Sequence, residues 1–214
     1  MSTRAEQKRK TRQNILDAAV KVMNQDRGLA ALSLREVAKE AGIAPTSFYR
    51  HFDTLEDMGL ALIKDAGKAL NQIIHDARIA QVESQQDLVQ QVVHVIMEHF
   101  RENGPLFRVL AREAMGSSRI LRRAIKKELQ HIKNETTALI SEESKRHQRN
   151  ITDPELVSDA IMNVAFYTCV AALDMPYALQ KDAERRLVHH IRALYIGAET
   201  MANTLHMERQ LMLS

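Results

Sequence analysis

Two short helices joined by a tight turn are predicted for residues 33–52, SLREVAKEAGIAPTSFYRHF, and no other stretch constrains the fold as strongly. Ser33 and Glu36 form a capping box, in which a hydroxyl and a carboxylate satisfy free backbone N–H groups at a helix start. Gly42 is expected to end this helix, because glycine adopts the left-handed conformation without steric cost. Pro45 suits the first turn of the second helix. The apolar face of the first helix consists of Leu34, Val37, Ala38 and Ala41.

The second helix, predicted from Thr46 to Phe52, has few aliphatic side chains and offers little to a core. It presents hydrogen-bond donors and flat rings instead, namely Thr46, Ser47, Tyr49, Arg50 and His51. A short polar helix that a glycine-containing turn holds at an angle to its neighbour suits the major groove of DNA. The spacing alone leaves an ordinary helical hairpin with a polar second helix as the alternative.

Residues 33–52 resemble the helix-turn-helix of TetR-family repressors, whose pattern is T/S-x-R-x-I/V-A-x-x-A-G-[IV] followed by [FL]-Y-x-H-F. The matching positions are Ser33, Arg35, Val37, Ala38, Ala41, Gly42, Ile43, Phe48, Tyr49, His51 and Phe52. The resemblance implies an all-α, TetR-like fold, with a three-helix DNA-binding domain and a helical domain that binds an effector and dimerises. The DNA contacts that we expect come from Arg4, Ser33, Arg35, Pro45, Thr46, Ser47, Tyr49, Arg50, His51 and Thr54.

The chain departs from the family pattern just after Phe52. Many members of the family carry a lysine there that meets a phosphate, whereas this chain continues with Asp53, Thr54 and Leu55. Thr54 is expected to cap the next helix, so that free backbone N–H groups at the helix start replace the lysine.

The composition favours a nearly all-helical protein. Of the 214 residues, 45% are hydrophobic and 27% are charged, which is typical of a globular protein of one or two domains. The seven glycines and four prolines are few, and they fall at breaks between apolar segments. We expect a DNA-binding domain in residues 1–53 and an effector-binding and dimerisation domain in residues 54–214.

Basic side chains are concentrated at the start of the chain. Residues 1–52 contain ten Lys and Arg against five Asp and Glu, a formal charge of +5, whereas the whole chain carries +3. A basic head on a near-neutral body is typical of a nucleic-acid-binding protein. Arg4 lies in the basic start of an amphipathic helix predicted for residues 1–24, where it can reach a phosphate or the minor groove. A frayed basic tail is the alternative for this segment.

The sequence disfavours several other classes of function. The single Cys169 excludes an internal disulfide, and its apolar surroundings predict a buried, unreactive thiol. The histidines lack the i, i+4 spacing of a helical metal pair, and no glycine-rich phosphate loop or nucleophile motif is present. We therefore expect no catalytic residue, no metal and no cofactor. No signal peptide and no apolar run of roughly 20 residues is recognised, so a cytoplasmic protein without a membrane segment is expected.

Further helices are predicted from apolar periodicity and from helix start and stop residues. They cover residues 54–79, 85–103, 105–115, 119–145, 154–173 and 183–207, and Asp153 is expected to cap the helix that starts at residue 154. In the TetR family the last two helices of each chain form a four-helix dimer interface. The resemblance therefore implies a homodimer on a palindromic, double-stranded operator. Packing of these two helices within one subunit is the alternative.

Residues 107–118, FRVLAREAMGSS, resemble a segment of the unsaturated-fatty-acid repressors, the FabR/DesT branch of the family. That branch senses long-chain acyl-CoA or acyl-ACP (acyl carrier protein) thioesters and represses fatty-acid desaturation or unsaturated-chain synthesis genes. An apolar helical body and arginines near its mouth suit such an effector. The expected ligand-binding residues are Phe107, Leu110, Arg112, Met115, Arg119 and Phe166. A structural ion pair between Arg112 and Glu113 is the alternative for the arginine.

A different lipophilic effector, as in repressors of efflux operons, is the alternative function for this chain. The sequence specifies neither the operator nor the preferred acyl chain. It also leaves open whether the effector tightens or releases DNA binding.

Overall fold

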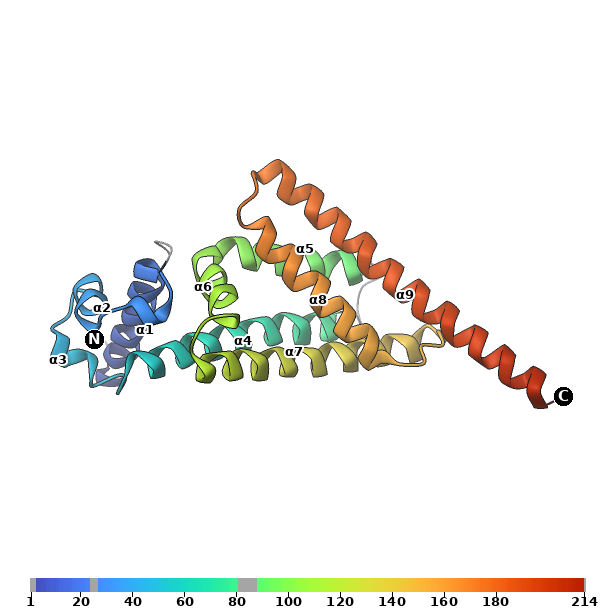
Figure 1. Ribbon diagram of the computed structural model, residues 1–214, viewed down its shortest axis with the longest axis horizontal. Coiled ribbons are helices and arrows are strands. Elements are labelled where there is room, and N and C mark those ends of the chain that lie inside the picture. Colours follow the sequence, from blue (N-terminus) through green and yellow to red (C-terminus); the bar gives the residue numbers. More distant parts are fainter. Residues whose placement is uncertain (1–2, 24–26, 81–87, 214) are drawn as a thin grey trace. The chain divides into compact units, whose positions relative to one another are not determined.

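Helices are the only regular structure in the part of the chain that the computed structural model describes, residues 3–23, 27–80 and 88–213 (Figure 1). They are α1 (Arg4–Met23), the 3-10 helix η1 (Leu29–Ala31), α2 (Leu34–Glu40), α3 (Pro45–Phe48), α4 (Leu55–Ala80), α5 (Leu88–Glu102), α6 (Gly104–Ala114), α7 (Arg119–Arg146), α8 (Pro154–Ala172) and α9 (Tyr177–Leu213). The all-α fold class predicted from the sequence is confirmed.

Contacts within the chain group it into two compact units. The first unit contains residues 1–68 and 103–128, so it combines α1, η1, α2 and α3 with α6 and the first parts of α4 and α7. The second unit contains residues 69–102 and 129–214, which include α5, α8 and α9. The division after residue 53 that the sequence predicts is a division of function, and it stays a prediction.

The first unit packs α1, α2 and α3 around aliphatic and aromatic side chains. Ile15 and Met23 on α1 and Val37 on α2 are fully buried, as their helical spacing predicts. Phe48 adds a fully buried ring from α3, and this ring lies 5.7 Å from the ring of Phe52. Consequently α3, although short, is held to the core by its one aromatic side chain.

Three short-range signals in the sequence form the structures that they predict. The Ser33 hydroxyl accepts a hydrogen bond from the Glu36 N–H at 3.2 Å, and the Glu36 carboxylate accepts one from the Ser33 N–H at 3.0 Å. Gly42 follows α2 with a φ of +67°, in the left-handed region that favours glycine. Asp153 caps α8, because its carboxylate accepts a hydrogen bond from the Leu156 N–H at 2.9 Å.

Three helix boundaries differ by four residues or more from the predictions, and one of them is the end of α9, which lies at Leu213 instead of residue 207. α3 ends at Phe48 instead of Phe52, because the N–H groups of Arg50 and His51 donate to carbonyls three residues back and form turns. α9 begins at Tyr177 instead of residue 183, because the Pro176 carbonyl accepts hydrogen bonds from N–H groups of the following turn. The predicted start of α5 at residue 85 lies outside the described residues.

The second unit has an apolar core of its own. Ile74 of α4 and Ile132 and Leu139 of α7 are buried together, and α8 covers them with Met162. α8 and α9 form an antiparallel hairpin, and α5 packs against both helices (Figure 1). Cys169 of α8 is buried, and burial raises the pKa of its thiol to about 12. The predicted buried thiol is therefore confirmed.

One helix in the described part of the chain is long and apolar enough to cross a membrane by length and composition alone, whereas the sequence analysis expected no such segment. This helix is α8, with a mean hydropathy of 1.2 and only 28% of its residues buried. Core helices of soluble proteins pass the same test, so a single such helix is a weak indication of a membrane span. Because few of its residues are buried, much of the surface of this apolar helix is exposed.

Candidate nucleic-acid interface

α3 and the turn after it present polar side chains around a buried anchor. Phe48 is fully buried, whereas Pro45 and Thr46 are exposed and Ser47 is half-buried. Tyr49 is 59% exposed, and its ring meets the Phe48 ring edge-on with 6.0 Å between the centroids. The structure therefore places these predicted DNA-binding residues together on one short segment, whose position depends on Phe48.

A charged pair fixes the start of α2. Arg27 donates from Nη1 to Glu36 Oε1 at 3.0 Å, and its Nη2 donates to the Ala31 carbonyl at 2.5 Å. The hydrogen bonds from Arg27 and from Ser33 lower the pKa of Glu36 to about 2, so this carboxylate stays ionised. Ser33, a predicted DNA contact, accepts in the cap and retains its hydroxyl proton for donation. Arg35, the next predicted contact, is exposed.

His51 lies half-buried near three cationic side chains. Burial lowers its pKa most, and Lys8, Arg12 and Arg50 lower it further. Its Nδ1 is buried without a hydrogen-bond partner among the described residues. Near pH 7 the imidazole is therefore neutral, and it lies beside positive charges that attract an anion.

Thr54 and Asp57 form a second capping box, at the start of α4. The Asp57 N–H donates to Thr54 Oγ1 at 3.0 Å. In return, the Thr54 N–H and hydroxyl donate to Asp57 Oδ2 at 3.0 and 2.9 Å. The cap expected at Thr54 is present, and both donors of Thr54 are used within it. A phosphate contact from Thr54 stays a prediction.

Arg4 is the first residue of α1, and its side chain is exposed. Thr3 and Glu6 form a third capping box around it, with the Thr3 N–H donating to Glu6 Oε2 at 2.7 Å and the Glu6 N–H donating to Thr3 Oγ1 at 3.2 Å. The basic start of the chain is therefore helical from residue 4, which disfavours the alternative of a frayed tail.

Arg4→Ala is expected to weaken binding to every DNA duplex by a similar factor, because a phosphate contact carries no base information. The slope of log K against log salt concentration should become shallower by about one unit. Titrations of an operator and a random duplex at several salt concentrations measure both effects. Arg185→Ala removes an exposed arginine of α9 as the control and should leave the slope unchanged. An unequal loss on the two duplexes would instead indicate that Arg4 reads bases.

The predicted ligand-binding residues lie in different environments. Phe107 of α6 is buried and Leu110 is half-buried. Met115 is 93% exposed, and Arg119 is exposed at the start of α7. Phe166 is a half-buried residue of α8, in the second unit. A ligand contact from any of these residues stays a prediction.

Arg112 and Glu113 bind main-chain groups of the first unit. Arg112 Nη1 donates to the carbonyls of Met23 at 3.3 Å and of Arg27 at 3.0 Å. Glu113 Oε1 accepts a hydrogen bond from the Leu29 N–H at 2.7 Å. Both side chains therefore bind main-chain groups, whereas the ion pair between them and a ligand contact from Arg112 stay predictions.

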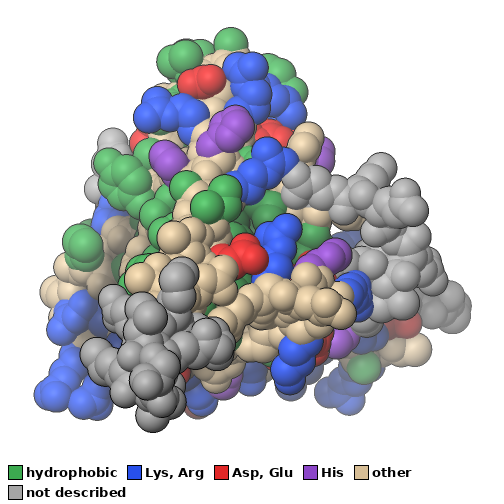
Figure 2. Space-filling view, turned by 90° about the vertical axis from the view of Figure 1, so that its right-hand side faces the viewer, with side chains coloured by type: hydrophobic (Ala, Val, Ile, Leu, Met, Phe, Trp, Pro, Cys, Tyr) green, Lys and Arg blue, Asp and Glu red, His purple; other side chains and the backbone are tan. Residues whose placement is uncertain are grey.

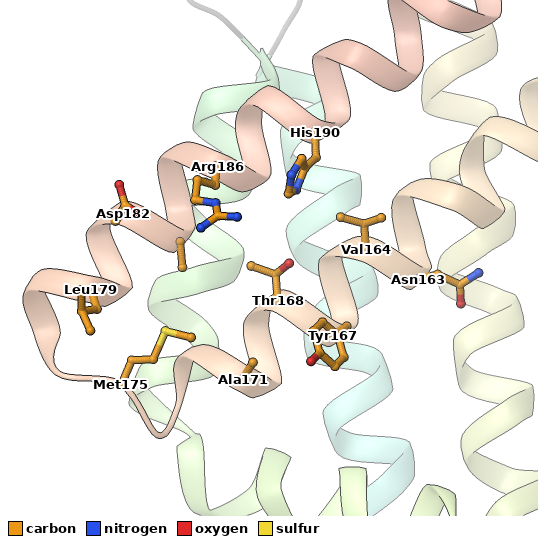
Figure 3. Close-up of a pocket in the computed structure, with 11 residues that line it drawn as sticks. Asn163, Val164, Tyr167, Thr168, Ala171, Met175, Leu179, Asp182, Arg186 and His190 are labelled. Atoms are coloured by element: carbon orange, nitrogen blue, oxygen red, sulfur yellow. The ribbon is translucent and has the colours of Figure 1, made fainter.

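A groove of about 670 Å³ lies between α8 and α9, and none of its lining residues was predicted as a site from the sequence. Arg186 and His190 of α9 and Thr168 of α8 point into it, while Met175 and Leu179 lie where the two helices are joined (Figure 3). The signal available in the sequence was the recurrence of small residues along α8, which predicts close approach of another helix without saying which one.

Apolar side chains are exposed on this hairpin, and two of them, Tyr167 and Leu179, also line the groove. The exposed side chains are Leu156 and Tyr167 on α8 and Tyr177, Leu179, Ile196 and Met201 on α9. At the top of Figure 2, where α8 and α9 are joined, apolar side chains lie beside Lys and Arg side chains. Several exposed apolar side chains on one pair of helices are typical of a face that another chain covers.

Comparison with known proteins assigns both parts of the chain. Residues 15–62 match the family described as "Bacterial regulatory proteins, tetR family". Residues 85–194 match the family described as "Tetracyclin repressor-like, C-terminal domain".

Solved structures of similar fold include three bacterial proteins. FadR from Bacillus subtilis, in complex with stearoyl-CoA, has 22% identity and a TM-score of 0.67 over 82% of this chain and 97% of that one. The fatty acid degradation regulator FadR from Bacillus halodurans has 19% identity and a TM-score of 0.66 over 88% and 94%. E. coli NemR in its reduced form has 17% identity and a TM-score of 0.68 over 86% and 97%. At these identities the similarity concerns the fold.

Proposed function

We propose a function for this chain on the premise that it belongs to the tetR family of bacterial regulatory proteins. The second family match alone covers residues 85–194, which is more than half of the chain. It is a DNA-binding transcriptional regulator. The proposal is that a homodimer binds a palindromic operator and represses fatty-acid genes, with a long-chain acyl-CoA or acyl-ACP as effector. We propose residues 1–53 as the DNA-binding part and residues 54–214 as the part for effector and dimer.

The observation that carries the DNA part of the proposal is the polar segment fixed by Phe48. Thr46, Tyr49 and Arg50 are exposed. They belong to residues 45–51, in which Phe48 is the only buried side chain. Exposed donors on a rigid support are what base reading in the major groove requires. Arg35 and His51 add positive or protonatable groups to the same head, where phosphate contacts set orientation on the duplex.

The proposed dimer uses the outer face of α8 and α9. Tyr167 is 76% exposed in the single chain, although it belongs to the most apolar helix. Gly197 lies on α9 with open space around it, so no contact among the described residues accounts for a glycine there. A glycine inside a helix costs roughly 1 kcal/mol relative to alanine, and close approach of a partner helix offsets that cost. Both observations support a second copy as the occupant of this face.

The proposed effector is supported by a resemblance in sequence and by a solved structure of similar fold. Residues 107–118 resemble the FabR/DesT segment, and a FadR of similar fold was crystallised with stearoyl-CoA. An acyl chain needs an apolar site, and its phosphate-bearing carrier needs cations near the entrance. Phe107 and Leu110 are the proposed apolar contacts and Arg119 is a proposed cation, all in the first unit, and a contact from Phe166 stays a separate prediction.

A gel-shift titration on the intergenic DNA next to the gene tests this function. Palmitoyl-CoA and oleoyl-CoA should change operator affinity at low micromolar concentration, whereas free CoA and acetyl-CoA should not, because they lack the apolar chain. Native mass spectrometry of the purified protein should detect an acyl species. Tight operator binding that no acyl-CoA changes, together with a different bound lipophile, would favour the efflux-type alternative.

Operator binding is also expected to strengthen as pH falls from about 7.5 to 6, because of His51. Burial and the neighbouring cations lower the pKa of His51 in the free protein, so it is neutral there. A DNA phosphate beside the ring would raise that pKa, so the complex takes up a proton and gains affinity as pH falls. Fluorescence anisotropy at fixed salt measures the slope of log K against pH. His51→Gln should flatten this slope, and an unchanged slope would contradict the phosphate contact.

A further inference from the structure

We infer that Arg112 and Glu113, at the end of α6, are positioning residues for the DNA-reading elements, which they hold through the connection between α1 and α2. This inference rests on the proposed role of the α3 segment in operator reading. It concerns two side chains that the sequence analysis connected with a ligand or with each other. All the residues involved belong to the first unit.

Glu113 is a buried carboxylate that acts on the main chain of η1. Its residue is 7% exposed, and its Oε1 accepts the Leu29 N–H at 2.7 Å across 84 positions of sequence. Leu29 is the first residue of η1, where backbone N–H groups lack helical partners. Burying a carboxylate is costly unless hydrogen bonds compensate. The contact therefore fixes the carboxylate and the start of η1 together.

Two glycines leave room for this carboxylate. A Cβ at Gly28 would lie 2.9 Å from Glu113 Oε1, and a Cβ at Gly116 would lie 2.9 Å from Glu113 Oε2. Gly28 has a φ of −80° and a ψ of 170°, an extended conformation that alanine also adopts. A methyl group at Gly28 would thus press on the carboxylate without straining its own backbone.

Arg112 acts on the end of α1 beside the same connection. Its Nη1 donates to the carbonyls of Met23 and Arg27, at 3.3 and 3.0 Å. The Met23 carbonyl, at the end of α1, also accepts the Arg27 N–H at 3.2 Å, so Arg112 links this helix end to the connection that follows it. The side chain of Arg27 in turn donates to Glu36, whose carboxylate caps α2. A continuous series of hydrogen bonds therefore leads from α6 to the first turn of the helix-turn-helix.

The position of α3 depends on this series, because η1 and the capping box set where α2 begins. Leu29, the first residue of η1, and Leu32, which follows η1, are both buried, so this connection is part of the packed head. A small displacement of α2 would move Tyr49 and Arg50 relative to base edges, whereas phosphate contacts tolerate such a shift more readily. Loss of the latch, defined as Arg112, Glu113 and the main-chain groups they bind, should lower operator preference more than general DNA affinity.

A mutant cycle between Gly28 and Glu113 tests the latch in the full-length protein. Glu113→Ala should weaken operator binding roughly tenfold and leave random-duplex binding within about twofold. Glu113→Gln retains an oxygen acceptor and should restore most of the operator affinity. Gly28→Ala should resemble Glu113→Ala, and the double variant should be no weaker than Glu113→Ala alone, because the shortened side chain leaves space for the methyl group.

A control variant separates positioning from general loss of stability. Gly67→Ala puts a Cβ 2.5 Å from Glu128 Oε2, which is a similar clash elsewhere in the first unit. It should reduce the thermal midpoint at least as much as Gly28→Ala, yet leave the ratio of operator to random affinity unchanged. Equal loss of that ratio in the control, or additive losses for Gly28→Ala and Glu113→Ala, would overturn the inference. A wild-type protein without operator preference would instead contradict the proposed function.

Discussion

Tyr49→Ala combined with Arg50→Ala is expected to remove operator-specific binding, with a loss of roughly a hundredfold or more. Each side chain that reads a base edge contributes on the order of 1–3 kcal/mol of discrimination, and the double variant removes two such side chains. Binding to a random duplex should persist at a reduced level, because Arg4 and the other cations of the head remain. Competition gel shifts with operator and random duplex measure the two affinities separately.

The fold should survive this double substitution. Tyr49 is 59% exposed, and its contact with the core is one edge-on ring contact with Phe48. Such a ring pair is worth about 0.5–1.5 kcal/mol, a minor part of the stability of the chain. Phe48 itself is unchanged, so the segment keeps its anchor. Circular dichroism and the mass in solution should therefore match those of the wild type.

Ile120→Ala combined with Arg123→Ala provides the matched control. Ile120 is 51% exposed and Arg123 is exposed, so this variant also loses one exposed large side chain and one exposed arginine, but both residues lie on α7, outside α3 and the proposed dimer face. This variant should bind the operator like the wild type. Wild-type affinity for the Tyr49 and Arg50 variant, or equal losses in both variants, would contradict the assignment of the α3 segment to the major groove.

The parts of the head that sequence reasoning predicted are those specified by neighbouring residues. The Ser33 and Glu36 capping box and the left-handed Gly42 involve groups within a few positions, so residue type is sufficient to predict them. The early end of α3 at Phe48 was missed, because turn and helix differ there only in hydrogen bonds one residue apart. Helical propensity cannot separate them over so short a segment.

Contacts between distant parts of the sequence were not predictable in the same way. The Glu113 carboxylate was read together with its neighbour Arg112, but its partner is the Leu29 N–H, 84 positions away. Every residue except proline has a main-chain N–H, so the periodicity of the side chains does not indicate which helix end will bind the Glu113 carboxylate. The close approach of the Glu113 carboxylate to Gly28 could not be predicted from the sequence either, since glycine is also common in ordinary turns.

The face proposed for dimerisation was partly predictable. The apolar, small-residue character of α8 indicated that a helix approaches it closely, and α9 does so within the chain. The sequence could not distinguish the inner side of α8 from its outer side, because α8 is apolar around much of its circumference. The structure separates them, since Cys169 faces inward and is buried while Tyr167 remains exposed.

Tyr167→Glu is expected to convert the dimer into monomers at micromolar concentration. A carboxylate at this position would be removed from water in the proposed interface without a partner, at a cost of several kcal/mol. In the free chain the same side chain remains in water, because Tyr167 is 76% exposed there. Analytical ultracentrifugation measures the dissociation constant. Thermal unfolding, once corrected for the loss of the dimer, should be little changed.

Operator binding should fall with the dimer, because the two halves of a palindrome are engaged together only by linked heads. Val95→Glu introduces the same charge at a partly exposed apolar position on α5 and should leave both dimer and operator affinity intact. Gly197→Leu offers a second variant without any new charge, since a Cβ there meets nothing within 4 Å in the chain. A dimer that persists in both Tyr167→Glu and Gly197→Leu would require another interface. A monomer that still binds the full palindrome with wild-type affinity would separate dimerisation from operator recognition.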